Sequence, residues 1–370
     1  MFLVKKNSEV ITLVIDIGSS SVGAALVSSV KKASPKMLFS TRLPIVLTNN
    51  SERGHSLSAI VSALDNVIKL VAAQHIVFHK SHIIFSSPWY VSQTNVLKKD
   101  FERPTLITND VVAQITKEIE NKFTEGSALK GEIVERRVVR AKLNGYEVAN
   151  PYNKKAKSLE IAHFASIVPT DALNSIKSVI GKYFHTLNNE ISSFSLAAYL
   201  TISGLKSEDK DFLIVDVRGE VTDVTLVTDG VLTKSLFFMQ GKNELVNTVA
   251  DNSSHTPTAA LSLITTTLNN NSVASAKTDT LKFSGNFKQV WLESYAKTLQ
   301  DLSESGAIPQ TVYLFADPDV EIFFENTLNE VKKDVGVYAL KHLNVKNYIQ
   351  TPSILTDEFL ALESIFVTIV

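Results

Sequence analysis

An aspartate and a run of serines follow an apolar segment near the start of the chain. The stretch VIDIGSSS contains Asp16, Gly18, Ser19, Ser20 and Ser21. A turn of small residues lets the backbone approach a ligand closely, so that its N–H groups and the serine hydroxyls can donate to phosphate oxygens. Asp16 stands where a carboxylate could hold Mg²⁺ through water. The alternative is an ordinary turn whose serines bond to nearby backbone groups.

The same arrangement occurs again in the second half of the chain. VIDIGSSSVGAALVS (14–28) aligns with IVDVRGEVTDVTLVT (214–228), which sets Asp16 against Asp216. Each stretch reads as strand, aspartate, turn and strand. Two unrelated hairpins are the alternative, since this pattern is common, but the agreement in register favours duplication. A duplicated chain would have two similar lobes that face a cleft, and each lobe would offer one turn to a shared ligand.

Between the two copies, the sequence predicts a compact α+β unit. Apolar residues at helical spacing predict helices near 56–75 and over ITNDVVAQITKEIENKF (107–123). An Asn144-Gly145 pair between two apolar runs predicts a hairpin, and SLEIAHFASIVP (158–169) predicts a further strand. Residues 80–165 would therefore form a small unit inserted in the first half.

Composition excludes several classes of protein. The 370 residues are 44% hydrophobic and 20% charged, which is typical of a globular protein. A formal net charge of -1 gives no basic field for nucleic acid. Cysteine is absent, which excludes disulfides, a thiol nucleophile and Cys-based zinc sites. No run approaches the ~18 apolar residues of a membrane helix, and we see no signal peptide, so we expect a cytoplasmic protein.

The turns that follow Asp16 and Asp216, called the two acid-tipped turns below, resemble the phosphate loops of the actin, Hsp70 and sugar-kinase superfamily. Within it, LNGYEVANPYNKKAKSLEIAHFASIVP (143–169) resembles the segment of the FtsA family in which a short hairpin, an Asn-Pro loop and a strand follow one another. LAAYLTISG (196–204) and LFFMQGKNELVNTVAD (236–251) also match that family in order and spacing. The PilM family shares the general layout and is the second choice.

The resemblance implies an α/β chain with a duplicated actin-like (ribonuclease H-like) two-lobe fold and a small α+β inserted domain of the SHS2 type in the first lobe. The domains would be a first lobe (1–79, 166–204 and 351–370), the inserted domain (80–165), and a second lobe (205–350) with a subdomain around 242–305. The implied function is a scaffold of bacterial cell division that binds an FtsZ-like ring protein and assembles with itself. The alternatives are a PilM-like adaptor for the tail of a pilus or secretion membrane protein and, in another class, a sugar-kinase phosphotransferase.

The resemblance also implies a site for ATP and Mg²⁺ between the lobes. Its residues would be Asp16, Gly18, Ser19, Ser20, Ser21, Asp216, Gly219 and Thr222, with Asp16 and Asp216 holding Mg²⁺ through water. The second turn departs from the family pattern, because Arg218 and Glu220 replace glycines and Val221 replaces a threonine. Arg218 could offset the charge of Glu220 or fill the phosphate space itself. The expected adenosine turn (316–319) lacks glycine. We therefore assign no catalytic residue and expect a weak ATPase at most.

A charged strand in the inserted unit is a candidate contact surface. The stretch VERRVV sets Arg136 and Arg137 beside Glu132 and Glu135, and this mixed charge favours an exposed strand face or a protein contact. An exposed edge strand there is a plausible place for self-association. The basic amphipathic helix with which FtsA binds membranes has no counterpart, so we expect recruitment to the inner face of the membrane by a partner.

Overall fold

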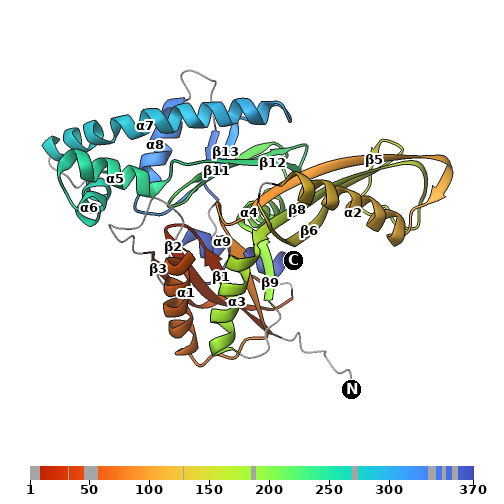
Figure 1. Cartoon of the computed structure of the whole chain (residues 1–370), viewed down its shortest axis with the longest axis horizontal. Helices are drawn as coiled ribbons and strands as arrows, with labels where there is room; N and C mark the ends of the chain where they lie inside the picture. Colours follow the sequence, from red (N-terminus) through yellow and green to blue (C-terminus); the bar gives the residue numbers. More distant parts are fainter. Residues whose placement is uncertain are drawn as a thin grey trace.

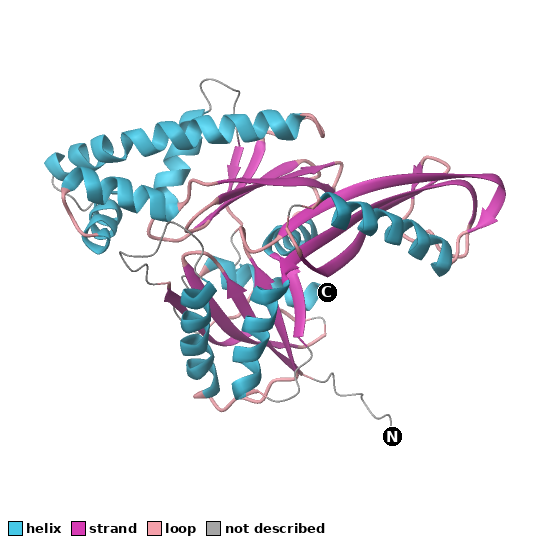
Figure 2. Ribbon diagram, viewed as in Figure 1, coloured by secondary structure: helices cyan, strands magenta, loops and turns pink. Residues whose placement is uncertain are grey.

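The structure, a computed structural model, describes residues 9–31, 33–45, 57–127, 129–184, 189–268, 274–331, 339–343, 347–351 and 357–370. Two lobes lie one above the other, and an elongated unit projects to one side of them (Figure 1). Each of the three parts contains its own β-sheet, and helices pack on all three (Figure 2).

The first lobe is built on a five-stranded sheet in the order β3-β2-β1-β4-β9. Its strands are β1 (Val10–Ile17), β2 (Ser21–Ser29), β3 (Lys36–Pro44), β4 (Lys80–Phe85) and β9 (Asn189–Ser193). Helices α1 (Leu57–Ala72) and α3 (Thr170–Tyr183) share one apolar cluster with β1, β2 and β4, so they cover one face of this sheet. The helix expected near 56–75 is α1, whose buried residues recur at helical spacing.

The second lobe is built on a sheet of the same design, in the order β12-β11-β10-β13-β14. Its strands are β10 (Phe212–Val217), β11 (Thr222–Thr228), β12 (Val231–Phe238), β13 (Thr311–Ala316) and β14 (Ala339–Lys341). Its helices are α5 (Lys242–Ser253), α6 (Pro257–Leu268), α7 (Ala274–Ser303) and α8 (Glu321–Val331). They pack on the sheet around the fully buried indole of Trp291.

The two sheets place the two aspartates equivalently. Asp16 is the penultimate residue of β1, which is antiparallel to β2 and parallel to β4. Asp216 is the penultimate residue of β10, which is antiparallel to β11 and parallel to β13. The predicted duplicated two-lobe α/β fold is therefore confirmed.

Two helices form the layer between the sheets. α9 (Glu358–Ile369) contacts β1, β2 and β3, whereas α4 (Phe194–Leu205) contacts both β4 of the first sheet and β10 and β12 of the second. One apolar cluster contains these helices together with Val14 of the first sheet and Ile214 of the second. Because burial of apolar surface stabilises the folded chain, this shared cluster holds the lobes together.

The inserted unit is a four-stranded sheet, β5-β8-β6-β7, with one helix against it. Its elements are β5 (Val91–Leu106), α2 (Asn109–Gly126), β6 (Gly131–Leu143), β7 (Tyr146–Glu147) and β8 (Lys155–Pro169). The predicted boundaries at residues 80 and 165 are corrected here. β4 (80–85) pairs in parallel with β1 and so belongs to the first lobe, and β8 continues to Pro169.

Within the part of the chain that the structure describes, no helix combines the length and the apolar character needed to span a membrane.

Candidate functional site

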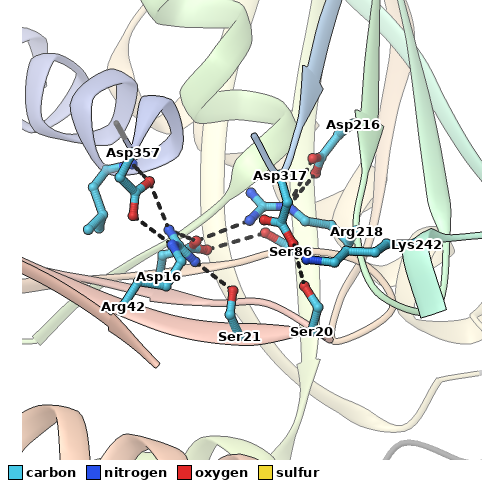
Figure 3. Close-up of polar contacts among 11 residues, drawn as sticks. Asp16, Ser20, Ser21, Arg42, Ser86, Asp216, Arg218, Lys242, Asp317 and Asp357 are labelled. Carbon is cyan, nitrogen blue, oxygen red and sulfur yellow. Dashed lines mark hydrogen bonds and ion pairs between the residues drawn. The ribbon is translucent and has the colours of Figure 1, made fainter. Parts of the chain in front are cut away.

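The turns that follow β1 and β10 meet at the side chain of Arg218, between the lobes (Figure 3). Nη1 of Arg218 donates to Oδ2 of Asp16 at 3.0 Å. Nε of Arg218 donates to Oδ1 and Oδ2 of Asp216 at 2.8 and 3.1 Å. Asp16 belongs to the first lobe and Asp216 to the second. The two aspartates that the repeat makes equivalent therefore share one guanidinium.

The guanidinium of Arg218 also lies against two aromatic rings. Its Cζ is 3.6 Å from the ring centroid of Phe359 on α9 and 4.6 Å from that of Phe194 on α4. Arg218 is only 1% exposed. A cation over an aromatic face is attracted by the ring quadrupole, more strongly when water is excluded. Carboxylates and rings thus replace water around this buried charge.

A second arginine, Arg42 on β3, completes the cluster. Its Nη2 donates to Oδ2 of Asp16 at 2.7 Å, and its Nε donates to Oδ2 of Asp357 at 2.6 Å. Its Nη1 donates to Oγ of Ser21 at 2.9 Å. A Cβ on Gly23 would lie 2.8 Å from Nη2 of Arg42, so a larger residue there would require this guanidinium to move. We call Asp16, Arg42, Asp216, Arg218 and Asp357 the interlobe cluster.

A lysine neutralises the acidic turn after β13. Nζ of Lys242, at the start of α5, donates to Oδ2 of Asp317 at 3.0 Å and to Oδ2 of Asp319 at 2.6 Å. Oγ of Ser20 donates to Oδ2 of Asp317 at 3.2 Å, which joins the first lobe to this turn. The resemblance implies that this turn (316–319) contacts the adenosine of a nucleotide. In this chain its two aspartates form ion pairs with Lys242.

The two acid-tipped turns are in direct contact with each other. A Cβ built on Gly219 would lie 2.7 Å from N and from Cβ of Ser20, so the second turn packs directly on the first. N of Glu220 donates to Oγ of Ser19 at 3.1 Å. The serine hydroxyls that could have faced a phosphate are therefore bonded to the chain itself.

The remaining predicted site residues maintain local structure. N of Gly18 donates to the carbonyl of Ser21 at 3.1 Å and closes the turn after β1. The hydroxyl of Thr222 donates to the carbonyl of Gln240 at 2.7 Å and accepts from Nε1 of Trp291 at 3.0 Å. Thr222 thus joins elements within the second lobe.

The carboxyl groups between the lobes differ in protonation. Burial alone would raise the pKa of Asp16, but the charges of Arg218 and Arg42 outweigh it and lower that pKa. Burial raises the pKa of Asp216 to about 7, against the opposing charge of Arg218. Glu363 on α9 is fully buried, and burial together with the negative charge of Asp16 raises its pKa well above the usual range. The lowered pKa keeps Asp16 ionised at neutral pH, whereas the raised pKa of Glu363 favours its protonated form.

Sequence reasoning missed several members of this site. Arg42 lies in the stretch FSTRLP, which contains no motif, and Lys242 gave no signal within its helix. Asp357 could have been recognised as a helix cap, since it accepts from the backbone of α9. The lone carboxylate of Glu363 in the apolar stretch LALESIFV was the other available signal, because a charge among core residues needs a reason.

The arrangement does not fit a metal-bound nucleotide. The carboxylates of Asp16 and Asp216 are directed at Arg218, and contact between Gly219 and Ser20 closes the space between the turns. Among the described residues, no group of three or more His, Cys, Asp or Glu side chains is placed to hold a metal ion. The nucleotide-binding role of the predicted residues stays a prediction.

A separate groove of about 400 Å³ lies where the inserted unit meets the first lobe. Its volume lies within the usual range for ligand pockets. Its apolar lining includes Val134, Ile191, Leu196 and Phe366, and its charged lining includes Glu135, Arg136, Arg137 and Glu190. We call it the β6–β9 groove, after the two strands that supply most of its lining.

One wall of the β6–β9 groove is fixed by Glu135 of β6. Its Oε2 accepts from N and Oγ of Ser193 at 3.1 and 2.8 Å and from Oγ of Ser166 at 3.2 Å. Glu135 is therefore buried, contrary to the exposed face that the sequence suggested. Burial raises its pKa to about 6 despite these hydrogen bonds. Arg137, by contrast, forms no ion pair with any described carboxylate.

Both strands at this groove have an edge without a strand partner among the described residues. β9 pairs only with β4. β6 pairs with β8, and with β7 only at Lys142 and Leu143. Such edges carry N–H and C=O groups that can pair with an added strand.

Comparisons with known proteins support the fold. No family model and no curated protein sequence matches the chain. The solved PilM-PilN type IV pilus biogenesis complex is 12% identical over 98% of this chain and 99% of that chain, with a TM-score of 0.68. The ethanolamine utilization protein EutJ from Carboxydothermus hydrogenoformans is 9% identical over 98% of this chain and 90% of that one, with a TM-score of 0.48.

A third structure, from Bacteroides thetaiotaomicron, is described as a protein with an actin-like ATPase fold. It is 11% identical over 96% of this chain and 95% of that chain, with a TM-score of 0.44. At 9–12% sequence identity, similarity to these structures shows the fold alone. None of the three structures is described as FtsA. The chain therefore shares its fold with the protein that it matches in the PilM-PilN complex, with two lobes of common design joined around a central layer of helices.

Proposed function

We propose that this chain is a PilM-like adaptor, which holds an extended segment of a membrane protein of a type IV pilus or secretion assembly. The observation that carries the proposal is the β6–β9 groove, a hollow of about 400 Å³ between the inserted unit and the first lobe. The partner would hold the adaptor at the inner face of the membrane. The full-length likeness to PilM in its complex with PilN supports this proposal over a role in cell division.

The backbone of the groove suits an extended segment. β9 and β6 each have an edge unpaired with any other described strand, and both line the groove. A peptide that adds a strand to such an edge gains affinity from main-chain hydrogen bonds. Its alternate side chains would point into the groove, where they determine specificity.

The side chains of the groove indicate what the segment contains. Val134, Ile191 and Leu196 offer apolar contacts. Arg137 lines the same groove and pairs with no described carboxylate. An acid near this guanidinium would form a charge-assisted hydrogen bond. We therefore expect a segment with alternating apolar residues and one acidic residue.

Peptide selection with the full chain tests the proposal. Short random peptides displayed on phage would be selected on the chain, and the dissociation constants of the selected peptides measured by fluorescence anisotropy. Arg137→Glu should weaken binding by about tenfold or more, because it sets like charges against each other. Arg103→Glu, on the exposed edge strand β5, is the matched control and should leave affinity unchanged. Equal affinity in both variants, or an enriched set without acids, contradicts the proposal.

A further inference from the structure

We propose that Arg218 takes the place of a metal-bound polyphosphate and holds the two lobes closed without any ligand. This inference goes beyond the adaptor function, because it concerns the interlobe cluster and not the β6–β9 groove. Its failure would leave the peptide-binding proposal standing.

The first step is the position of the positive charge. In the arrangement that the resemblance implies, Asp16 and Asp216 face each other across Mg²⁺ and phosphate. In this chain one guanidinium lies between them, 3.0 Å from Oδ2 of Asp16 and 2.8 Å from Oδ1 of Asp216. The planar fork of arginine suits two carboxylates at once. Arg218 therefore makes directly the link between lobes that a cation would otherwise make.

The second step is the space that remains. Gly219 and Ser20 are in backbone contact, as the 2.7 Å approach of a Cβ on Gly219 to N of Ser20 shows. The ring of Phe359 lies 3.6 Å from Cζ of Arg218 on another side. A phosphate between the two turns would have to push them apart and move Arg218 out of its site.

The third step is the cost of moving Arg218. Its departure would leave the carboxylate of Asp16, which is fully buried, with Arg42 as its one ion-pair partner among the described residues. Asp216, 3% exposed, would keep no ion pair with any described residue. Removing one member of a buried ion pair is strongly destabilising, because the partner charge stays buried without compensation. A nucleotide would have to offset this loss before it gained any affinity.

At the turn after β13, where the resemblance implies the adenosine would bind, the chain's own side chains also take the place of a ligand. Lys242 pairs with Asp317 and Asp319, so a cation of the chain already balances the acidic turn. The bond from Ser20 to Asp317 closes this side onto the first lobe. The bonds from Arg218 to Asp16 and from Ser20 to Asp317 are thus two contacts between the lobes that the chain's own side chains make.

Nucleotide titration of the unmodified full-length chain is the first test. Mg-ATP and Mg-ADP, each at millimolar concentration, should leave Tm unchanged in differential scanning fluorimetry and give no saturable heat in calorimetry. A ligand that binds the folded state and not the unfolded state raises Tm by an amount that keeps growing with the logarithm of its concentration above Kd. A rise in Tm that grows with the concentration of either nucleotide, or saturable heat in calorimetry, overturns the proposal.

The second test removes the guanidinium and then returns it. Arg218→Ala should lower Tm by on the order of 5 °C or more, whereas Arg103→Ala, at an exposed position, should change it little. Guanidinium chloride at non-denaturing, millimolar concentration should then raise the Tm of Arg218→Ala, and sodium chloride at the same ionic strength should not.

An Arg218→Ala variant as stable as the unmodified chain, or one that guanidinium does not stabilise, overturns the proposal. If Arg218→Ala does not fold, Arg218→Lys is used instead. Lysine keeps the charge but lacks the fork that spans both aspartates. We therefore expect Arg218→Lys to fold, with a Tm below that of the unmodified chain and of Arg103→Ala. A Tm for Arg218→Lys equal to that of the unmodified chain contradicts it.

Discussion

At the scale of single residues, Asp16 and Glu135 are both buried carboxyl groups, but their pKa values shift in opposite directions. Asp16 lies within 3.0 Å of two guanidinium groups, which lower its pKa in spite of burial. Glu135 accepts hydrogen bonds from Ser193 and Ser166 and forms no ion pair with any described residue, and burial raises its pKa to about 6 from an ordinary value of 4.5. The same side-chain chemistry therefore gives an ionised group between the lobes and a readily protonated one at the β6–β9 groove.

The raised pKa of Glu135 predicts how stability depends on pH. Because the folded state holds this proton more tightly than the unfolded state does, the chain loses stability as pH rises from about 4.5 to 6. One pKa unit corresponds to ~1.4 kcal/mol, so the loss from this group is roughly 2 kcal/mol. Glu135→Gln, which cannot titrate, should show a flatter dependence of Tm on pH over this range.

The control for this prediction is Glu132→Gln, at an exposed position on the same strand. It should follow the pH dependence of the unmodified chain. Parallel curves for Glu135→Gln and the unmodified chain would show that Glu135 carries no shifted proton.

At the scale of elements, close backbone approaches fix the turns of the second lobe. A Cβ on Gly241, the residue before α5, would lie 2.4 Å from the carbonyl oxygens of both Arg218 and Gly219. These are backbone atoms and cannot rotate away. The loop from β12 to α5 is therefore pressed against the turn that carries Arg218, and glycine is the residue that permits it.

We expect Gly241→Ala to destabilise the chain by ~1–3 kcal/mol or more, since the added methyl group forces backbone atoms apart. Gly285→Ala is the matched control, because a Cβ at Gly285 meets nothing within 4 Å and the residue lies in α7. Alanine favours a helix over glycine, so this control should keep or raise Tm. Chemical denaturation of both variants measures the difference, and equal loss in the two would contradict the steric argument.

The elements were the part that the sequence could predict best. Apolar periodicity identified α1, and the shared strand-Asp-turn-strand pattern identified the duplicated sheets. The boundary of the inserted unit at residue 80 was wrong, because β4 is a short apolar strand and sequence does not say with which sheet such a strand pairs. The Arg218–Asp16 contact spans 202 positions, so the sequence revealed the unusual Arg218 but not its partner in the other lobe.

At the scale of the whole molecule, the start of α4 connects the two sites. Oγ of Ser193 donates to Oε2 of Glu135 at the β6–β9 groove. The ring centroid of the next residue, Phe194, lies 4.6 Å from Cζ of Arg218 in the interlobe cluster. α4 is also part of the apolar layer shared by both lobes. The inserted unit, the first lobe and the second lobe all meet at α4. The sequence does not show this meeting point, so it could not predict that the β6–β9 groove lies beside the interlobe cluster.

This connection predicts that the interlobe cluster supports the shape of the groove. Loss of the guanidinium in Arg218→Ala removes one contact of Phe194, and the adjacent Ser193 should then hold Glu135 less firmly. We expect the affinity for a peptide selected on the β6–β9 groove to fall several-fold in Arg218→Ala, measured by anisotropy well below the Tm of the variant. Guanidinium at millimolar concentration should restore that affinity, and Arg103→Ala should match the unmodified chain. If Arg218→Ala binds the peptide as tightly as the unmodified chain, the groove keeps its shape without the cluster, and the two sites are energetically independent.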